Sequence, residues 1–142
     1  MDLLEESDRA LIFSSLIAQH VATTGTRILI DCFAGVGGNT IAFAKSGKWD
    51  IIIAIEESEA VMKCAKHNGE IYGVANQISW CLGDSFDVLN KYPELQESDP
   101  VIFASPPWGG KFIHLAKYRF VLLSNLCLNQ VPDTERIVFS IL

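Results

Sequence analysis

The stretch that decides the fold of this chain is a glycine-rich turn, Asp31-Cys32-Phe33-Ala34-Gly35-Val36-Gly37-Gly38-Asn39-Thr40. It follows an apolar run at 27–31 that reads as a β-strand, and it leads into a segment of helical period at about 39–46. Glycines between a strand and a helix let the backbone approach a ligand and aim the first helix amides at it. The turn therefore predicts a nucleotide-binding unit of strand, turn and helix.

The segments after the turn repeat this alternation. The expected strands lie at 51–56, 78–82, 100–104 and 136–142. The expected helices lie at about 58–70 and at 115–129, the latter as one helix or a pair. The alternation is typical of a Rossmann-like α/β fold, in which a mostly parallel, twisted sheet carries flanking helices.

The chain reads as one domain, residues 1–142. An amphipathic segment at 7–21 predicts an N-terminal helix, capped by Ser7 or Asp8. The sequence shows no internal repeat and no low-complexity linker that would separate a second domain. It ends inside an apolar run that reads as a strand, so we expect a domain truncated at the C-terminus.

Composition restricts the class of protein further. The 142 residues are 49% hydrophobic and 20% charged, enough apolar material for one core. The net charge of -6 argues against a broad surface that follows nucleic-acid phosphates, but it allows recognition of one nucleotide in a pocket. The acidic opening at 1–6 does not resemble a secretion signal, and no apolar run approaches the roughly 20 residues of a membrane span.

Cysteine and histidine spacing predicts no metal site. The four cysteines form no CxxC pair, and the histidines show no ligand spacing. We interpret the cysteines as ordinary buried thiols in a reducing compartment. The residues concerned are Cys32, Cys64, Cys81, Cys127, His20, His67 and His114.

Two acids flank the turn and indicate its ligand. Asp31 ends the first strand and is expected at the mouth of the turn, where it would repel a pyrophosphate and attract a cationic amino group. This favours S-adenosylmethionine over a dinucleotide. Glu56 closes the second strand 25 positions later, the usual place for a carboxylate that accepts hydrogen bonds from ribose hydroxyls.

A third acid, Asp84, follows the third strand and is expected to accept a hydrogen bond from the adenine amine. A Gly-Asp turn is also common without a ligand. The full set of expected cofactor-binding residues is Asp31, Phe33, Gly35, Gly37, Asn39, Thr40, Glu56, Asp84 and Ser85.

A second motif, Ser105-Pro106-Pro107-Trp108-Gly109-Gly110, follows the fourth strand at the sheet edge where α/β folds bind substrates. The two prolines fix the turn and leave rigid acceptors near Ser105 and Pro106, which suit an amine that becomes positively charged as it is methylated. Trp108 offers a face for a purine, above all one that carries the positive charge of 7-methylation. We therefore expect Ser105, Pro106 and Trp108 to act in catalysis, and Ser105, Pro107 and Trp108 to bind the base.

These motifs, together with Ala65-Lys66-His67-Asn68, Ile71-Tyr72-Gly73-Val74 and Gly83-Asp84, resemble the trimethylguanosine synthases. These are class I methyltransferases that convert the 7-methylguanosine cap of small nuclear and nucleolar RNAs to the 2,2,7-trimethyl form. The resemblance runs from about 28 to 110. It implies that three acids contact the methyl donor, that Ser105 and Pro106 face the amine, and that Trp108 stacks on the base. Against the family's seven-stranded sheet, the last two strands are expected to be missing.

The resemblance also implies a capped RNA as partner, with proteins of the small nuclear or nucleolar ribonucleoproteins as further candidates, and a nuclear or nucleolar location. Two alternatives stay open: an amine methyltransferase for another RNA base, and a non-catalytic module that binds the donor. An oxidoreductase that uses a dinucleotide is disfavoured. Its fingerprint is G-x-G-x-x-G, and after Gly35 and Gly37 this chain has Gly38 but no glycine in the third position of that spacing.

Overall fold

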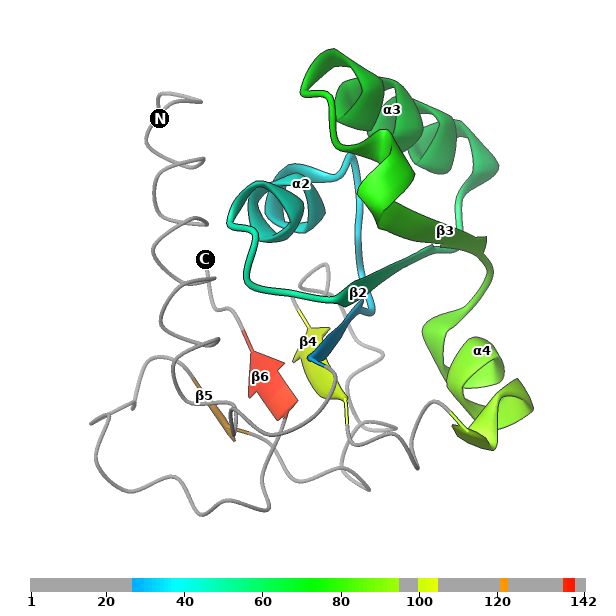
Figure 1. The fold of residues 1–142 in the computed structure, drawn as a ribbon. Coiled ribbons are helices and arrows are strands. Elements are labelled where there is room, and N and C mark those ends of the chain that lie inside the picture. The colour runs from blue at the N-terminus through cyan, green and yellow to red at the C-terminus, as the bar shows by residue number, and fades with distance from the viewer. Residues whose placement is uncertain (1–26, 95–99, 105–120, 123–136, 140–142) are drawn as a thin grey trace.

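The computed structural model describes residues 27–94, 100–104, 121–122 and 137–139 (Figure 1). The strands are β1 (Ile28–Asp31), β2 (Ile51–Glu56), β3 (Ile78–Leu82), β4 (Val101–Ala104), β5 (Val121–Leu122) and β6 (Ile137–Phe139). The helices are α2 (Gly38–Lys45), α3 (Glu59–Ile71), α4 (Ser85–Lys91) and the short 3-10 helix η1 (Ala75–Gln77).

The strands form one sheet in the order β3-β2-β1-β4-β6-β5, and each neighbouring pair is parallel. In the register, Asp31 of β1 lies between Ala54 of β2 and Phe103 of β4, and Glu56 pairs with Leu82 of β3. Strands β2 and β3 follow β1 on one side, whereas β4 lies on its other side. This reversal confirms the Rossmann-like class, and it places the topological switch point, where such sheets bind their ligands, at the carboxyl end of β1.

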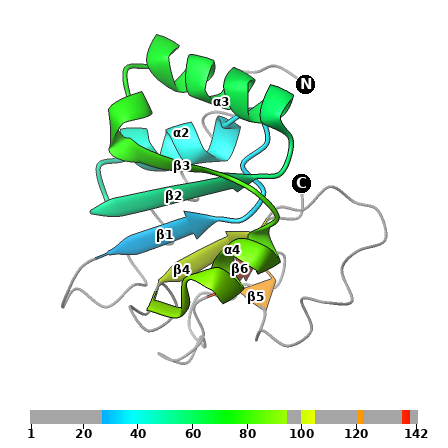
Figure 2. The ribbon, with the colours of Figure 1, turned by 90° about the vertical axis from the view of Figure 1, so that its right-hand side faces the viewer.

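Helices cover both faces of the sheet, α2 and α3 on one and α4 on the other (Figure 2). Successive side chains of a β-strand point to opposite faces of the sheet. Leu29 and Phe103 pack with Ile41 and Phe43 of α2 in one buried cluster. Ile30 points the other way and packs in a second cluster with Val88 and Leu89 of α4. In the described residues, β1 to β4 thus lie between two apolar layers.

Helix α3 begins where the sequence indicated, because the Ser58 side chain accepts a hydrogen bond from the Val61 amide and caps the helix. Its buried residues, Met62, Ala65 and Gly69, recur at helical spacing. Cys64 lies between them in sequence and points outward, so it is exposed. The expectation of a buried thiol was wrong for this cysteine.

Two elements differ from the sequence prediction. Val121–Leu122 form a parallel strand against β6, inside the segment expected as helix 115–129, so the sheet has six strands in the described residues where we expected five. A short apolar run fits either period, and pairing to a sheet decides between them. Helix α4 was not predicted at all, since its seven residues are too few to show a clear period.

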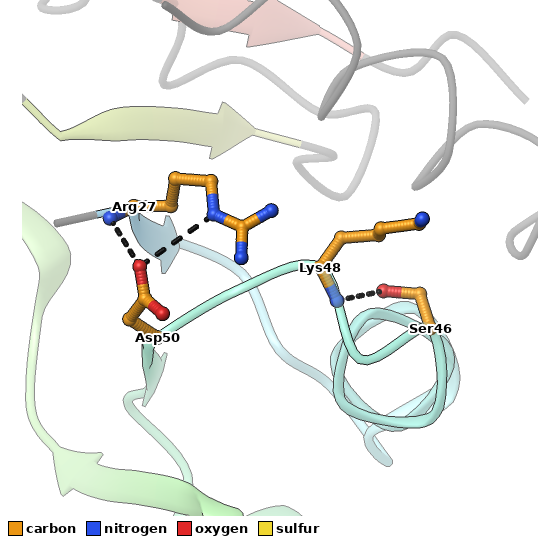
Figure 3. A network of polar contacts seen from close by, with 4 residues as sticks. All are labelled: Arg27, Ser46, Lys48 and Asp50. Carbon is orange, nitrogen blue, oxygen red and sulfur yellow. Dashed lines mark hydrogen bonds and ion pairs between the residues drawn. The ribbon is translucent and has the colours of Figure 1, made fainter. Parts of the chain in front are cut away.

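A polar network closes the opposite, amino-terminal edge of β1 and β2 (Figure 3). The Arg27 backbone N–H donates to Asp50 Oδ2 over 2.7 Å, and its guanidinium Nε lies 3.5 Å from the same oxygen. The hydrogen bond from the Arg27 backbone is the main cause that lowers the pKa of Asp50, and the charge of the guanidinium lowers it further. Next to it, the Lys48 amide donates to the Ser46 hydroxyl at the end of α2. The Arg27–Asp50 bonds thus join the residues directly before β1 and β2.

Several predicted segments lie outside the described residues: the helix at 7–21, the motif at 105–110, most of 115–129, and 140–142. No helix in the described part of the chain has both the length and the apolar character that a membrane crossing requires.

Candidate functional site

The glycine turn lies at the carboxyl end of β1, at the point where the strand order reverses. Its backbone is tied to both neighbouring strands: the Cys32 amide donates to the Phe103 carbonyl of β4, and the Ala34 amide donates to the Ile55 carbonyl of β2, each over 2.9 Å. Such a position, at the topological switch point, is where open α/β sheets bind their ligands. The sequence predicted the turn between the first strand and the helix that follows it, and the structure has it between β1 and α2.

Two glycines give the turn its shape. Gly35 and Gly37 have φ of 55° and 92°, in the left-handed region that other residues seldom adopt. A Cβ on Gly35 would meet nothing within 4 Å, whereas one on Gly37 would press on Ile41 and Ala65. Gly37 is also the N-cap of α2 and supplies no side-chain hydrogen bond to it. The first amides of α2 are therefore not capped by a side chain at the N-cap position, which suits a polar ligand.

Asp31 lies beneath the turn rather than at its mouth. It is fully buried, and its carboxylate accepts hydrogen bonds from the Thr40 hydroxyl (2.6 Å) and from the Phe33 amide (3.2 Å). Burial raises the pKa of Asp31 to about 6, against the lowering by these two bonds and with a small further rise from the charge of Glu56. The Asp31 side chain is thus directed to two donors within the turn and its following helix, not to solvent. Asp31 and Thr40 thus shape the turn from within.

Glu56 joins the turn to the second strand. Its half-buried carboxylate accepts the Gly35 amide on Oε2 (3.0 Å) and the Ser58 amide on Oε1 (2.9 Å). Each carboxylate oxygen has two acceptor positions, so the side chain keeps capacity for further donors. Ribose hydroxyls are such donors, and the position at the end of β2 is the one expected for them.

Asp84 and Ser85 approach the same edge from β3. The Gly83 amide donates to the Glu56 carbonyl over 2.9 Å, which brings this loop against the end of β2. Asp84 is exposed, and its Oδ1 accepts the Phe86 and Asp87 amides, so it caps α4. Ser85 is buried and donates its hydroxyl to the Cys32 carbonyl of the glycine turn. Ser85 thus ties this loop to the glycine turn, whereas Asp84 fixes the start of α4.

The remaining expected site residues divide into described and undescribed ones. Phe33 and Asn39 are half-buried in the turn. Ser105, Pro106, Pro107 and Trp108 lie outside the described residues, directly after β4, whose neighbour in the sheet is β1. In the described ranges, no group of three or more histidine, cysteine, aspartate or glutamate side chains is placed to hold a metal ion.

The sequence prediction missed two features of the site. The first is the cap of α4, although Asp84 followed three positions later by Asp87 resembles the capping-box pattern and was a usable signal. The second is a hydrogen bond of 2.9 Å from Asn68 Nδ2 on α3 to the Val36 carbonyl of the glycine turn. No local pattern predicts it, because 32 residues separate the two partners.

The fold and the glycine turn together define a Rossmann-like domain of the class I methyltransferase type. Solved structures share this fold. They include an S-adenosylmethionine-dependent methyltransferase from Agrobacterium tumefaciens (TM-score 0.58, 17% identity, 74% of this chain and 33% of that one). An RNA methyltransferase from Salinibacter ruber in complex with S-adenosyl-L-homocysteine is also similar (TM-score 0.51, 22% identity, 71% and 57%).

The chain belongs to the RNA cap guanine-N2 methyltransferase family, whose model matches residues 26–139. Among curated proteins, it is 39% identical over 84 residues to the trimethylguanosine synthase of Schizosaccharomyces pombe and 32% identical over 82 residues to that of Saccharomyces cerevisiae. Each match covers 58% of this chain, but only 34% and 25% of the two relatives. The chain thus spans about a third or less of these relatives.

Proposed function

We propose that this chain binds S-adenosylmethionine and methylates the exocyclic N2 amine of the 7-methylguanosine cap of small nuclear and nucleolar RNAs, giving 2,2,7-trimethylguanosine. The observation that carries the proposal is membership of the cap guanine-N2 family over 26–139, with the glycine turn and Glu56 at the switch point of the sheet. The names of the curated relatives support the same activity.

The described residues fit the donor. A Cβ built on Gly35 would meet nothing within 4 Å, so there is open space at this position of the turn. The glycine backbone can therefore come close to a ligand. In the proposal, Glu56 accepts the ribose hydroxyls and Asp84 borders the adenine. Asp31 and Thr40 hold the turn in shape, with Phe33, Gly37, Asn39 and Ser85 completing the cofactor-binding set. The donor, when bound, supplies a sulfonium methyl group, which the amine nitrogen accepts with loss of one proton.

The substrate half of the site rests on the motif after β4. In the proposal, carbonyl and hydroxyl acceptors at Ser105 and Pro106 hold the protons of the amine, and Pro107 fixes the turn. Acceptors of this kind stabilise the positive charge that grows on nitrogen. Trp108 stacks on the methylated base, whose positive charge an indole face attracts. The cap is thus bound as one nucleotide, which suits a chain with a net charge of -6.

The test is a methyl-transfer assay with a 7-methylguanosine cap dinucleotide and, in parallel, an uncapped RNA oligonucleotide. We expect incorporation into the capped substrate only. Trp108→Ala should raise the KM for the cap analogue by roughly tenfold, since stacking a base on an aromatic residue contributes about 1 to 3 kcal/mol. Donor affinity should not change in that variant. Unchanged cap kinetics would remove Trp108 from the substrate site.

Two other outcomes would redirect the proposal. Incorporation into the uncapped oligonucleotide alone would indicate a base-amine methyltransferase of other specificity. Donor binding by calorimetry without turnover on any cap analogue would indicate a non-catalytic module that binds the donor. Absence of donor binding would refute the cap methyltransferase, the base-amine methyltransferase and the donor-binding module alike.

The same proposal places the protein in the nucleus, including the nucleolus, with ribonucleoprotein proteins as partners, and treats residues 1–142 as one domain. Imaging of a fluorescent fusion of the full chain tests the location. Exclusion from the nucleus would contradict it.

A further inference from the structure

A side chain of α3 reaches across to the glycine turn. Asn68 is half-buried, and its Nδ2 donates a hydrogen bond of 2.9 Å to the carbonyl oxygen of Val36. Val36 itself is 56% exposed and stands between the two left-handed glycines of the turn. The hydrogen bond thus holds the turn at an exposed residue.

The bond fixes one peptide unit from both sides. The carbonyl of Val36 and the amide of Gly37 belong to the same planar peptide group. The amide donates to the Ala34 carbonyl over 2.9 Å, while the carbonyl accepts from Asn68. A peptide unit held at both ends cannot rotate, although the φ of its glycine neighbour is otherwise free to change.

Packing one turn earlier on α3 acts at the same place. Ala65 is fully buried, and its Cβ lies 3.4 Å from where a Cβ on Gly37 would stand. Ala65 and Asn68 are three positions apart, so they project from the same side of the helix. One side chain therefore packs against the turn, and the other binds it by a hydrogen bond.

We propose that Asn68 is a positioning residue that holds the glycine turn in the conformation that receives the methyl donor. This inference rests on the proposed function. A turn ordered in advance does not have to be ordered on binding, so the hydrogen bond should increase donor affinity. Since the bond is partly open to solvent, its share of global stability is small and its effect is local.

The experiment uses the full chain with Asn68→Ala and Asn68→Asp, beside the same two substitutions at Asn76. Asn76 is an exposed asparagine of η1, which precedes β3 and so lies at the sheet edge opposite the turn. Three quantities are measured: the Kd for S-adenosyl-L-homocysteine by calorimetry, the exchange rate of the Gly37 amide by NMR, and the melting temperature. Asn68→Ala improves helix propensity, so loss of α3 cannot explain weaker binding.

Both Asn68 variants should bind S-adenosyl-L-homocysteine about three- to tenfold more weakly, and their Gly37 amide should exchange about fivefold faster, as expected for one hydrogen bond. The Asn76 variants should match the unmodified chain. Gly37 exchange and Kd both within twofold of the Asn76 variants would overturn the proposal, as would weaker binding that simply follows a fall in melting temperature. If the unmodified chain binds no donor, the proposed function fails, and Gly37 exchange still decides whether Asn68 holds the turn.

Discussion

Thr40 Oγ1 donates a hydrogen bond of 2.6 Å to Asp31 Oδ2, and both side chains are fully buried. The bond joins the last residue of β1 to the first turn of α2, across the whole glycine turn. An acid in such a place costs free energy as long as it is ionised, because burial penalises the charge more than one hydroxyl and one amide offset it. The geometry of the turn is therefore coupled to the protonation of Asp31.

This coupling predicts a pH dependence of stability. The pKa of Asp31 rises from 3.8 to about 6 on folding, so between these values the folded chain binds a proton that the unfolded chain does not. Stability from this group is therefore present at about pH 4 and is lost as the pH rises through 6. Two pKa units correspond to about 3 kcal/mol. Urea unfolding should show Asp31→Asn gaining about that much, relative to the unmodified chain, between pH 4 and pH 7. Parallel pH profiles for the two proteins would contradict the buried acid.

Removal of the Thr40 hydroxyl should act in the opposite direction. In Thr40→Val the shape is kept, but Asp31 loses the hydrogen bond that lowers its pKa most. We expect a loss of about 1.5 to 3 kcal/mol in the free energy of unfolding at pH 7, the usual contribution of a hydrogen bond to a charged group. Thr40→Ser keeps the hydroxyl and should cost only about 1 kcal/mol, for the missing methyl group. Equal losses in the two variants would show that the hydroxyl has no part in the effect.

Asp31 and Glu56 differ in how much of their structural role could be predicted from the sequence. Spacing alone placed both acids correctly at the strand ends, because parallel strands bring their carboxyl ends to one edge. It did not show that Asp31 turns inward, since that depends on the Thr40 hydroxyl and on coverage by other elements. Val121–Leu122 is a similar case: the run is apolar in either period, and only its pairing with β6 makes it a strand.

Glu56→Gln should weaken donor binding by about tenfold or more. Both carboxylate oxygens accept backbone amides, from Gly35 and from Ser58. A glutamine amide has only one oxygen, so its NH2 group would face one of these donors, and hydrogen bonds to a charged acceptor are worth about 1.5 to 3 kcal/mol. The readout is the Kd for S-adenosyl-L-homocysteine. Glu70→Gln is the matched control, because Glu70 is a carboxylate of α3 whose side chain is 70% exposed. A Kd within twofold of this control would show that Glu56 does not act on the donor.

The two neighbouring glycines Gly37 and Gly38 should respond to alanine in opposite ways. At Gly37 the φ of 92° is unfavourable for alanine by roughly 1 to 2 kcal/mol, and its Cβ would stand 3.3 Å from Ile41 Cδ1 and 3.4 Å from Ala65 Cβ. Gly38 is the first residue of α2, and a Cβ there meets nothing within 4 Å. Chemical denaturation should therefore show Gly37→Ala destabilised by about 2 kcal/mol, and Gly38→Ala unchanged or stabilised by up to about 1 kcal/mol through helix propensity. Similar losses in both would mean that the helix start, rather than the left-handed turn, requires glycine.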